Sequence, residues 1–231
     1  MFAAHHVADV IHPYPVLRPY LIEGMARALR GPRAASRAIV VRVSSERRRA
    51  TYEELCKVPD HLVAEIIDGE LFTSPRPALP HALASSMIGF ALIGTFGGPP
   101  EGSAAPGGWW ILDEPELHFG EDVLVPDLAG WRRERLPAIP DAAALALPPD
   151  WACEIVSRST GALDRGRKMQ VYARERVGHL WIVDPGPRTL EVYRLEAGRW
   201  LVASTHAGSV EVRAEPFDVV DLDTTRWWRE P

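Results

Sequence analysis

Apolar and polar residues follow the periods of strands and helices along most of the chain. Val63–Ile67 and Glu70–Phe72 predict two short strands, which the turn signal Asp68-Gly69 joins into a hairpin. His81–Ile93 carries apolar residues at helical spacing and predicts a packed helix. Before the hairpin, Thr51-Tyr-Glu-Glu predicts a helix start, because a threonine hydroxyl and a glutamate three residues later form a capping box.

The middle and C-terminal parts of the chain are mostly strand-like. Strands are predicted, in chain order, at Trp109–Leu112, Glu116–Phe119, Val123–Trp131, Trp151–Ser157, Leu180–Val183, Leu190–Leu195, Arg199–Ser204 and Ser209–Val212. The segment Trp151–Ser157 is apolar at odd and even positions, which is typical of a central strand in a sheet covered on both faces. Asp164–Arg174 predicts a second packing helix, and Ala142–Leu147 a helical turn within a proline-rich loop. The pattern predicts an α/β (α+β mixed) domain.

The first 50 residues differ from the rest. They contain the run Arg47–Arg49, several further arginines and four prolines, with a short helix predicted at Leu21–Leu29 and a strand at Ala38–Val43. We expect residues 1–50 to form an Arg-rich, partly disordered extension, and residues 51–231 to form one domain. Two interpretations of the extension stay open: a basic arm that contacts phosphates, and a segment without function.

Composition narrows the classes of function. A chain of 231 residues suits one domain with a substantial core, and its net charge of −5 argues against a non-specific DNA coat but not against a nuclease. We find no apolar run near the roughly 18–20 residues of a membrane span, and no secretion signal. We therefore expect a cytoplasmic protein with no membrane partner. Cys56 and Cys153 lie in apolar segments and are expected to be buried free thiols.

Glu154 is the residue that most needs an explanation. It lies in the middle of the apolar strand segment at 151–157, and burying an unpaired carboxylate costs several kcal/mol. It therefore requires a partner, either a cation at a functional site or an arginine in an internal salt bridge.

Asp127 poses a similar question. It follows Val123–Pro126, where the proline marks an interruption or an edge of the strand ladder, although an aspartate at a strand end is common. If the two strands are neighbours, Asp127 and Glu154 converge, and a divalent cation relieves their repulsion. Oxygen ligands of this kind favour Mg²⁺ or Mn²⁺.

Lys168 is one of only two lysines among 26 basic residues, the other being Lys57. It lies one turn before Tyr172 on the predicted helix at 164–174, so its ammonium can reach the strand that carries Glu154. The alternative is a surface ion pair with Asp164, four residues earlier. In the first case Asp127, Glu154 and Lys168 form one site for metal-assisted phosphodiester hydrolysis, where the lysine orients or deprotonates the attacking water and donates to the phosphate.

The ordered set of motifs around these residues resembles a known family. The chain carries, in order, IIDGEL at 66–71, His81, VPDLAGW at 125–131, CEIVSRST at 153–160, Asp164, Lys168, Tyr172 and LWIVDP at 180–185. This set resembles the Uma family of restriction-endonuclease-like proteins, within the PD-(D/E)XK nuclease superfamily, over roughly residues 51 to 228. The resemblance implies a restriction-endonuclease-like core, a central mixed β-sheet flanked by helices, with the two acids on adjacent strands.

The resemblance also implies roles for individual residues. Asp127 matches the motif aspartate, Glu154 the second acid, and Glu65 the glutamate that serves many superfamily members as a third metal ligand. The usual motif lysine position is Val156 here, and Lys168 matches the helix lysine that is thought to substitute in this family. The backbone carbonyl of Val156 is an accessory candidate. A surface position remains the alternative for Glu65.

Other residues carry weaker hypotheses. His81 is an accessory candidate as a second base, against a packing histidine at a helix start. The pairs Trp109-Trp110 and Trp227-Trp228 suit core or dimer packing better than base stacking. Asp184 is expected to cap the turn before Pro185, and Gly178 to end the helix in place of Arg176.

The sequence thus supports three functional hypotheses. The first is a Mg²⁺- or Mn²⁺-dependent DNA endonuclease, for which a homodimer is plausible in double-strand cutting. The second is an inactive nuclease-fold domain that binds nucleic acid or a protein partner, which the net charge and Val156 favour. The third is a structural or assembly protein.

Overall fold

The structure is a computed structural model, and it describes residues 48–98, 106–157 and 159–228. These residues belong to one compact unit, Glu46–Pro231. The helix expected at Leu21–Leu29, the strand expected at Ala38–Val43 and the arginine-rich arm lie outside the described residues.

A mixed sheet forms the centre of the described unit. Its strands lie in the order β11-β10-β9-β8-β6-β3. They span, in chain order, β3 Trp109–Asp113, β6 Leu128–Arg132, β8 Trp151–Ile155, β9 His179–Asp184, β10 Thr189–Glu196 and β11 Arg199–Ala207. β8 and β9 are parallel and the other neighbours are antiparallel. Every residue of β8 is buried, which confirms the central strand predicted from its two apolar faces.

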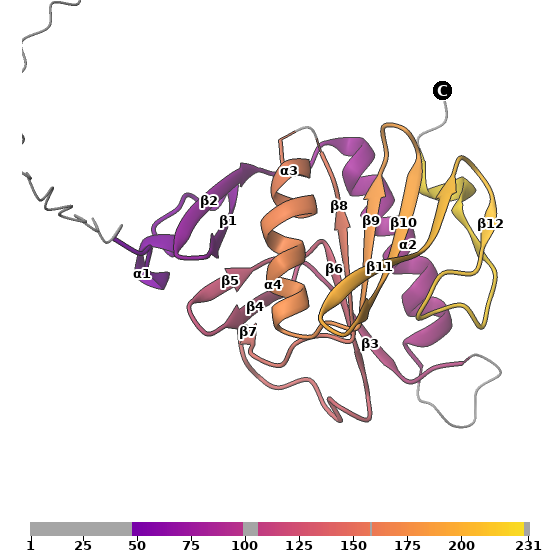
Figure 1. The fold of residues 1–231 in the computed structure, drawn as a ribbon, viewed down its shortest axis with the longest axis horizontal. Helices are drawn as coiled ribbons and strands as arrows, with labels where there is room; N and C mark the ends of the chain where they lie inside the picture. Colours follow the sequence, from indigo (N-terminus) through magenta and orange to yellow (C-terminus); the bar gives the residue numbers. More distant parts are fainter. Residues whose placement is uncertain (1–47, 99–105, 158, 229–231) are drawn as a thin grey trace, which may run out of the picture. The chain divides into compact units, whose positions relative to one another are not determined.

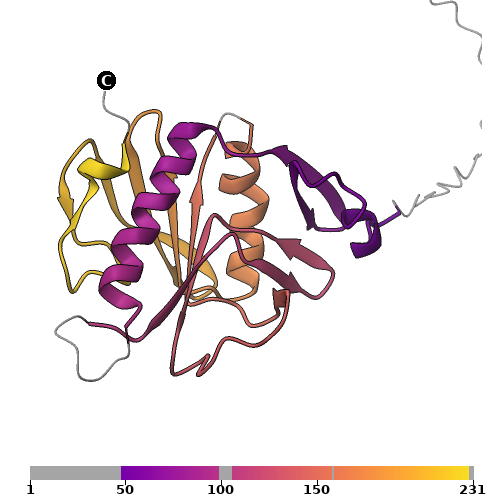
Figure 2. The same cartoon turned by 180° about the vertical axis from the view of Figure 1, so that it is seen from behind.

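Helices cover the two faces of this sheet (Figures 1 and 2). α2, Leu79–Phe96, lies on one face, and its buried side chains share a core cluster with Trp151, Cys153 and Ile155. On the other face lies a helix of three consecutive parts, α3 Gly161–Leu163, the π-helical turn η1 Asp164–Lys168 and α4 Met169–Arg174. Its buried residues share a second cluster with Ala152 and Val156. Alternating residues of β8 thus enter separate cores.

The helix α2 corrects one expectation. Over its 18 residues it has a mean hydropathy of 1.4, so by length and composition alone it could cross a membrane. This is weak evidence for a span, because the core helix of a soluble protein can have the same properties. Its residues Ala84, Ile88, Leu92 and Phe96 pack in the core beneath the sheet.

A second sheet lies beside the first, in the order β2-β1-β5-β4-β7. Its strands are β1 Leu62–Ile67, β2 Glu70–Pro75, β4 Glu116–Phe119, β5 Asp122–Leu124 and β7 Ala144–Leu145. The predicted hairpin is confirmed, with Asp68 and Gly69 at φ of 53° and 79° as a tight two-residue turn requires. The capping box at Thr51 is also confirmed, at the start of α1, Tyr52–Leu55.

Two predicted elements are wrong. The single strand expected at Val123–Trp131 is two strands, β5 and β6, which belong to different sheets and are separated by residues 125–127. Pro126 lacks an N–H group for the ladder, so the chain can leave one sheet and enter the other there. The helical turn expected at Ala142–Leu147 is instead β7, which pairs in parallel with β4.

The C-terminal part completes the α2-side core. β12 Glu211–Val212 pairs with β13 Leu222–Asp223, and the 3-10 helix η2 Thr224–Trp227 follows. Trp109, Trp227 and Trp228 are buried in the core, as the packing interpretation of the tryptophan pairs predicted, and Trp110 is partly buried.

Three local expectations have different outcomes. Cys153 is a buried free thiol as expected, but Cys56 is exposed. Asp184 caps its turn as predicted, accepting a hydrogen bond from the N–H of Gly186 at 3.0 Å. Gly178 does not end the helix: Arg176 itself adopts the left-handed conformation, with φ of 61°.

Candidate functional site

Glu154 lies on the α4 face of β8 and is 2% exposed. Its two carboxylate oxygens have different donors. The ammonium of Lys168 lies 2.8 Å from Oε2, and the hydroxyl of Tyr172 donates to Oε1 at 2.5 Å. The partner that the sequence demanded for this buried carboxylate is therefore a lysine together with a tyrosine.

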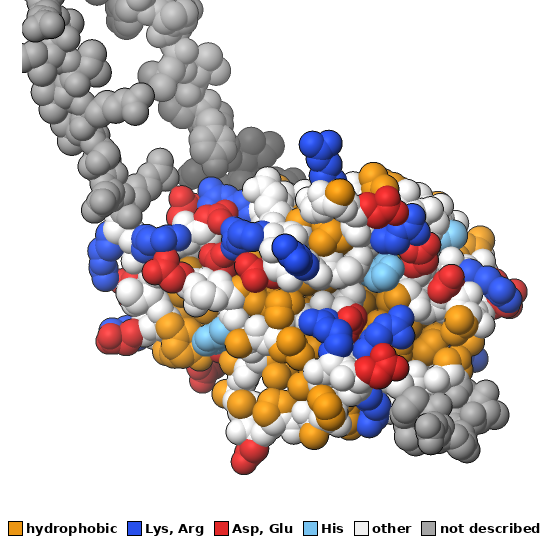
Figure 3. All heavy atoms as spheres, turned by 60° about the horizontal axis from the view of Figure 1, so that its bottom comes forward, with side chains coloured by type: hydrophobic (Ala, Val, Ile, Leu, Met, Phe, Trp, Pro, Cys, Tyr) orange, Lys and Arg blue, Asp and Glu red, His pale blue; other side chains and the backbone are white. Residues whose placement is uncertain are grey.

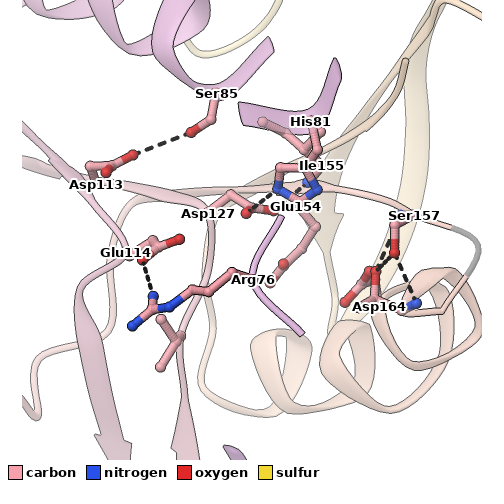
Figure 4. Close-up of polar contacts among 12 residues, drawn as sticks. Arg76, His81, Ser85, Asp113, Glu114, Asp127, Glu154, Ile155, Ser157 and Asp164 are labelled. Atoms are coloured by element: carbon pink, nitrogen blue, oxygen red, sulfur yellow. Dashed lines mark hydrogen bonds and ion pairs between the residues drawn. The ribbon is translucent and has the colours of Figure 1, made fainter. Parts of the chain in front are cut away.

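Asp127 lies where the chain passes from β5 to β6, directly before Leu128, which pairs with Cys153 of β8. Its Oδ2 accepts a hydrogen bond from the N–H of Ile155 at 2.6 Å. Its Oδ1 lies 2.5 Å from Nε2 of His81, in the first turn of α2 (Figure 4). The structure thus brings Asp127, which directly precedes β6, beside the backbone of the neighbouring strand β8 next to Glu154.

Lys168 ends the π-helical turn and is 3% exposed. Its ammonium lies 2.8 Å from Glu154, 3.0 Å from Glu65 and 3.6 Å from Asp164. A π-helical turn inserts one extra residue into a helix and is frequent at functional sites. The pairing with Asp164 exists, but as a buried contact, so its interpretation as a surface ion pair is wrong.

Glu65, on β1, completes the charged cluster and is 7% exposed, so the surface interpretation is wrong here too. Its Oε1 accepts a hydrogen bond from the N–H of Val125 at 2.8 Å as well as the contact from Lys168. Glu65 therefore links the second sheet to the segment that leads into Asp127.

These carboxylates open into one cavity of about 160 Å³. Its lining comes from β1, the segment between β2 and α2, the segment between β5 and β6, β8, and the start of the helix that carries Lys168. The lining residues include Glu65, Arg76, His81, Glu114, Asp127, Glu154, Ile155, Asp164 and Lys168.

Val156 is absent from the lining, whereas its neighbour Ile155 belongs to it. The N–H of Val156 donates to the carbonyl of Val183 at 2.8 Å, and its side chain packs in the α4-side cluster. Val156 does share the strand face of Glu154, as expected for positions two apart.

The cluster holds more carboxylates than cations, and the shifts in pKa follow from this. Burial raises the pKa of Glu154 well above its ordinary range; Lys168 partly opposes this, while Asp164, Asp127 and Glu65 raise it further. Burial also raises the pKa of Asp164.

Burial by itself would lower the pKa of Lys168, but the carboxylates of Glu154 and Glu65 outweigh it, so the pKa lies well above its ordinary value. The lysine is therefore suited to donating a hydrogen bond and neutralising charge. A lysine tuned to lose its proton and act as a base does not match this environment.

The donor set fits a divalent cation. Oxygen donors from carboxylates suit Mg²⁺ or Mn²⁺, and the surplus of negative charge in the cavity calls for another cation. Asp127 and Glu154, with Glu65, are the residues that would hold it. Within residues 48–98, 106–157 and 159–228, no three His, Cys, Asp or Glu side chains already form such a site, and the ammonium of Lys168 contacts both Glu65 and Glu154.

Sequence reasoning missed the roles of Tyr172 and Asp164. Burial raises the pKa of Tyr172 well above its ordinary value, so its hydroxyl stays protonated and donates to Glu154. Its position four residues after Lys168 was the available signal, since such residues share a helix face.

Comparisons with known proteins agree with the family resemblance seen in the sequence. The family described as "Uma2: Putative restriction endonuclease" matches residues 49–224. A crystal structure described as "a putative nuclease belonging to DUF820 from Anabaena variabilis ATCC 29413" superposes with a TM-score of 0.62 at 20% sequence identity, covering 77% of this chain and 97% of that chain. This likeness supports the restriction-endonuclease-like fold. No curated protein matches the chain.

Proposed function

Because the chain belongs to the Uma2 family, whose description is "Putative restriction endonuclease", we propose that it is a metal-dependent DNA endonuclease that hydrolyses phosphodiester bonds. The observation that carries the proposal is the cavity lined by Asp127 and Glu154, in which Glu154 and Glu65 contact the buried ammonium of Lys168. Such a surplus of buried carboxylates is costly for stability alone, and it is explained if the cavity takes a cation and a phosphate.

The residues divide the chemistry among them. When bound, Mg²⁺ or Mn²⁺ would supply Lewis acidity and neutralise charge on the phosphate, held by Asp127 and Glu154 with Glu65. Lys168 donates to the scissile phosphate and offsets the charge that develops there. Tyr172 fixes one oxygen of Glu154, which leaves the other directed to Lys168. His81 orients Asp127 through the contact between its Nε2 and Oδ1 of the carboxylate, in which the imidazole N–H donates.

The second candidate, a domain that binds without cutting, is favoured by the contacts of Lys168. Three carboxylates lie around its ammonium, and a lysine so engaged has to release one of them before it can contact a phosphate. The apolar Val156 at the usual lysine position also favours this second candidate.

Plasmid cleavage in Mg²⁺ or Mn²⁺ separates the two. We expect wild-type protein to nick or linearise plasmid, and Asp127→Asn, Glu154→Gln and Lys168→Met each to lower the rate about 10²–10³-fold. Asp221→Asn is the matched control, because this carboxylate forms an exposed ion pair with Arg213 outside the cavity and should leave the rate unchanged. Equal cleavage by all these proteins would show a contaminant, and no cleavage with retained DNA binding would favour the second candidate.

Two further parts of the proposal concern assembly and location. We propose a cytoplasmic protein that forms a homodimer when it cuts both strands, since one site hydrolyses one strand at a time. Light scattering with and without a DNA duplex measures the stoichiometry. A monomer that linearises plasmid in a single encounter contradicts the dimer.

A further inference from the structure

A cavity that takes a nucleic-acid strand needs a positively charged side chain at its surface to contact the phosphate backbone, and Lys168 is too buried to be that side chain. The lysine and arginine side chains among the described lining residues are Lys168 and Arg76. Lys168 is 3% exposed and surrounded by carboxylates, whereas the side chain of Arg76 is 55% exposed. A polyanion that approaches this acidic cavity therefore meets Arg76 first.

Arg76 is held in place by its backbone. It lies in the segment between β2 and α2, with Pro75 before it and Pro77 after it. Proline fixes its own φ, and it restricts the residue before it to extended conformations. The pair therefore presents the arginine at the cavity wall with little freedom of the main chain.

The guanidinium has two partners in the free protein. Nη1 of Arg76 lies 3.1 Å from Oε2 of Glu114 (Figure 4). Nη2 donates to the carbonyl of Asp60 at 3.1 Å. The carboxylate of Glu114 is 35% exposed, so the pair is screened by water and contributes little to stability. A phosphate, which arginine binds through two parallel hydrogen bonds, can replace such a partner.

Glu114 is itself tied to the candidate site. It adopts φ of 42°, an uncommon conformation for a glutamate, in the turn between β3 and β4. Its N–H donates to the carbonyl of Asp127 at 3.1 Å. Arg76 and Glu114 also line a second pocket, on the side of Tyr52 and Cys56, so the ion pair stands between the two hollows.

We infer that Arg76 binds a backbone phosphate beside the scissile one, and that Glu114 holds the guanidinium in the free protein and gives it up to that phosphate. The inference rests on the proposed function, in that the cavity takes a nucleic-acid strand. It extends that function by naming Arg76 as the residue that contacts the nucleic-acid backbone and Glu114 as the carboxylate that opposes binding. On the face drawn in Figure 3, the described side chains of both charges are interspersed, so this face carries no continuous basic field.

The test is DNA binding, measured by fluorescence anisotropy with a labelled duplex in Ca²⁺, with gel analysis to show that the duplex stays intact. We expect Arg76→Gln to weaken binding about 5- to 10-fold, and to reduce the slope of log K against log salt by about 0.9, the value for one lost phosphate contact. Glu114→Gln is expected to tighten binding about 2- to 5-fold, because the guanidinium then has no carboxylate at position 114 to give up before it binds a phosphate. Arg76→Lys keeps the charge and should keep most of the slope.

Arg213→Gln is the matched control, since Arg213 is also an exposed arginine paired with one carboxylate, Asp221, and does not line the cavity. Unchanged affinity and slope in Arg76→Gln, an effect no larger than that of Arg213→Gln, or no DNA binding by the wild-type protein would each overturn the inference. Thermal unfolding of each variant checks that it is folded.

The outcomes separate this inference from the proposed function. Cleavage by the wild-type protein with unchanged binding by Arg76→Gln removes the inference alone. Binding that depends on Arg76 in a protein that never cleaves removes the endonuclease and keeps the inference.

Discussion

The two faces of β8 bury their side chains in opposite ways. Cys153 and Ile155 point to the α2 side and meet an apolar core rich in aromatic rings, where Trp151, Trp181 and Phe217 pack edge to face. Glu154 points to the α4 side and meets Lys168 and Tyr172. One five-residue strand therefore separates a face stabilised by apolar burial from a face where each buried charge depends on a partner.

The two faces of β8 are therefore expected to respond differently to mutation. Apolar contacts are non-directional, so a mutation there lowers the free energy of unfolding in proportion to the apolar group that is removed. A buried ion pair is of little net benefit, but it becomes very costly when one partner is lost. The charged face is therefore the one expected to carry function, because stability alone would be served as well by apolar residues.

The largest effect is expected for Lys168→Met. It removes the ammonium and leaves the carboxylates of Glu154, Glu65 and Asp164 without their shared cation, so the free energy of unfolding should fall by about 3–5 kcal/mol. Urea unfolding without divalent cations measures it.

The other lysine provides the control. Lys57→Met removes an exposed i,i+4 pair with Glu53 and should cost at most about 0.5 kcal/mol. A similar loss of unfolding free energy in the two variants would contradict the dependence of the buried carboxylates on Lys168.

An intermediate effect is expected from the pH dependence of Glu154. Its folded pKa is raised above the ordinary value of 4.5, so above that pH the folded protein keeps a proton that the unfolded chain has released. The free energy of unfolding therefore falls as pH rises from 4.5 towards the raised pKa, by up to about 1.4 kcal/mol per pH unit for one proton.

Glu154→Gln removes this titration, so the difference between the wild-type and variant curves isolates it. Urea unfolding at several pH values without divalent cations provides both curves. Parallel curves across this range would mean that Glu154 keeps an ordinary pKa.

The smallest effect is expected on the apolar face. Ile155→Val removes one methylene from the α2-side core and should cost about 0.5–1.5 kcal/mol. The cost should be the same at every pH, because the side chain that is shortened packs in the apolar α2-side core. A cost that varies with pH would show that the two faces are coupled through the backbone of β8, whose N–H at Ile155 is bound to Asp127.

Much of the fold could be predicted from local pattern. The hairpin at β1 and β2, the helix α2 and the buried strand β8 follow from turn residues and periodicity, which act over a few neighbouring positions. Pro126 indicated an interruption within Val123–Trp131. That the two parts belong to different sheets could not be predicted, because the local pattern does not show which partner strand each part meets. The same holds for β7, which forms through one long-range pairing with β4.

The sequence by itself determined that Glu154 must be buried and must have a partner, because an acid in an apolar strand admits no other solution. It also placed Asp127, Lys168 and Glu65 in one ordered set. Only the tertiary structure decided that Lys168 lies between three carboxylates, that Tyr172 takes the second oxygen of Glu154, and that Arg76 lies at the cavity wall. Those contacts join residues far apart in the chain, and their distances depend on how two sheets and a π-helical turn pack together.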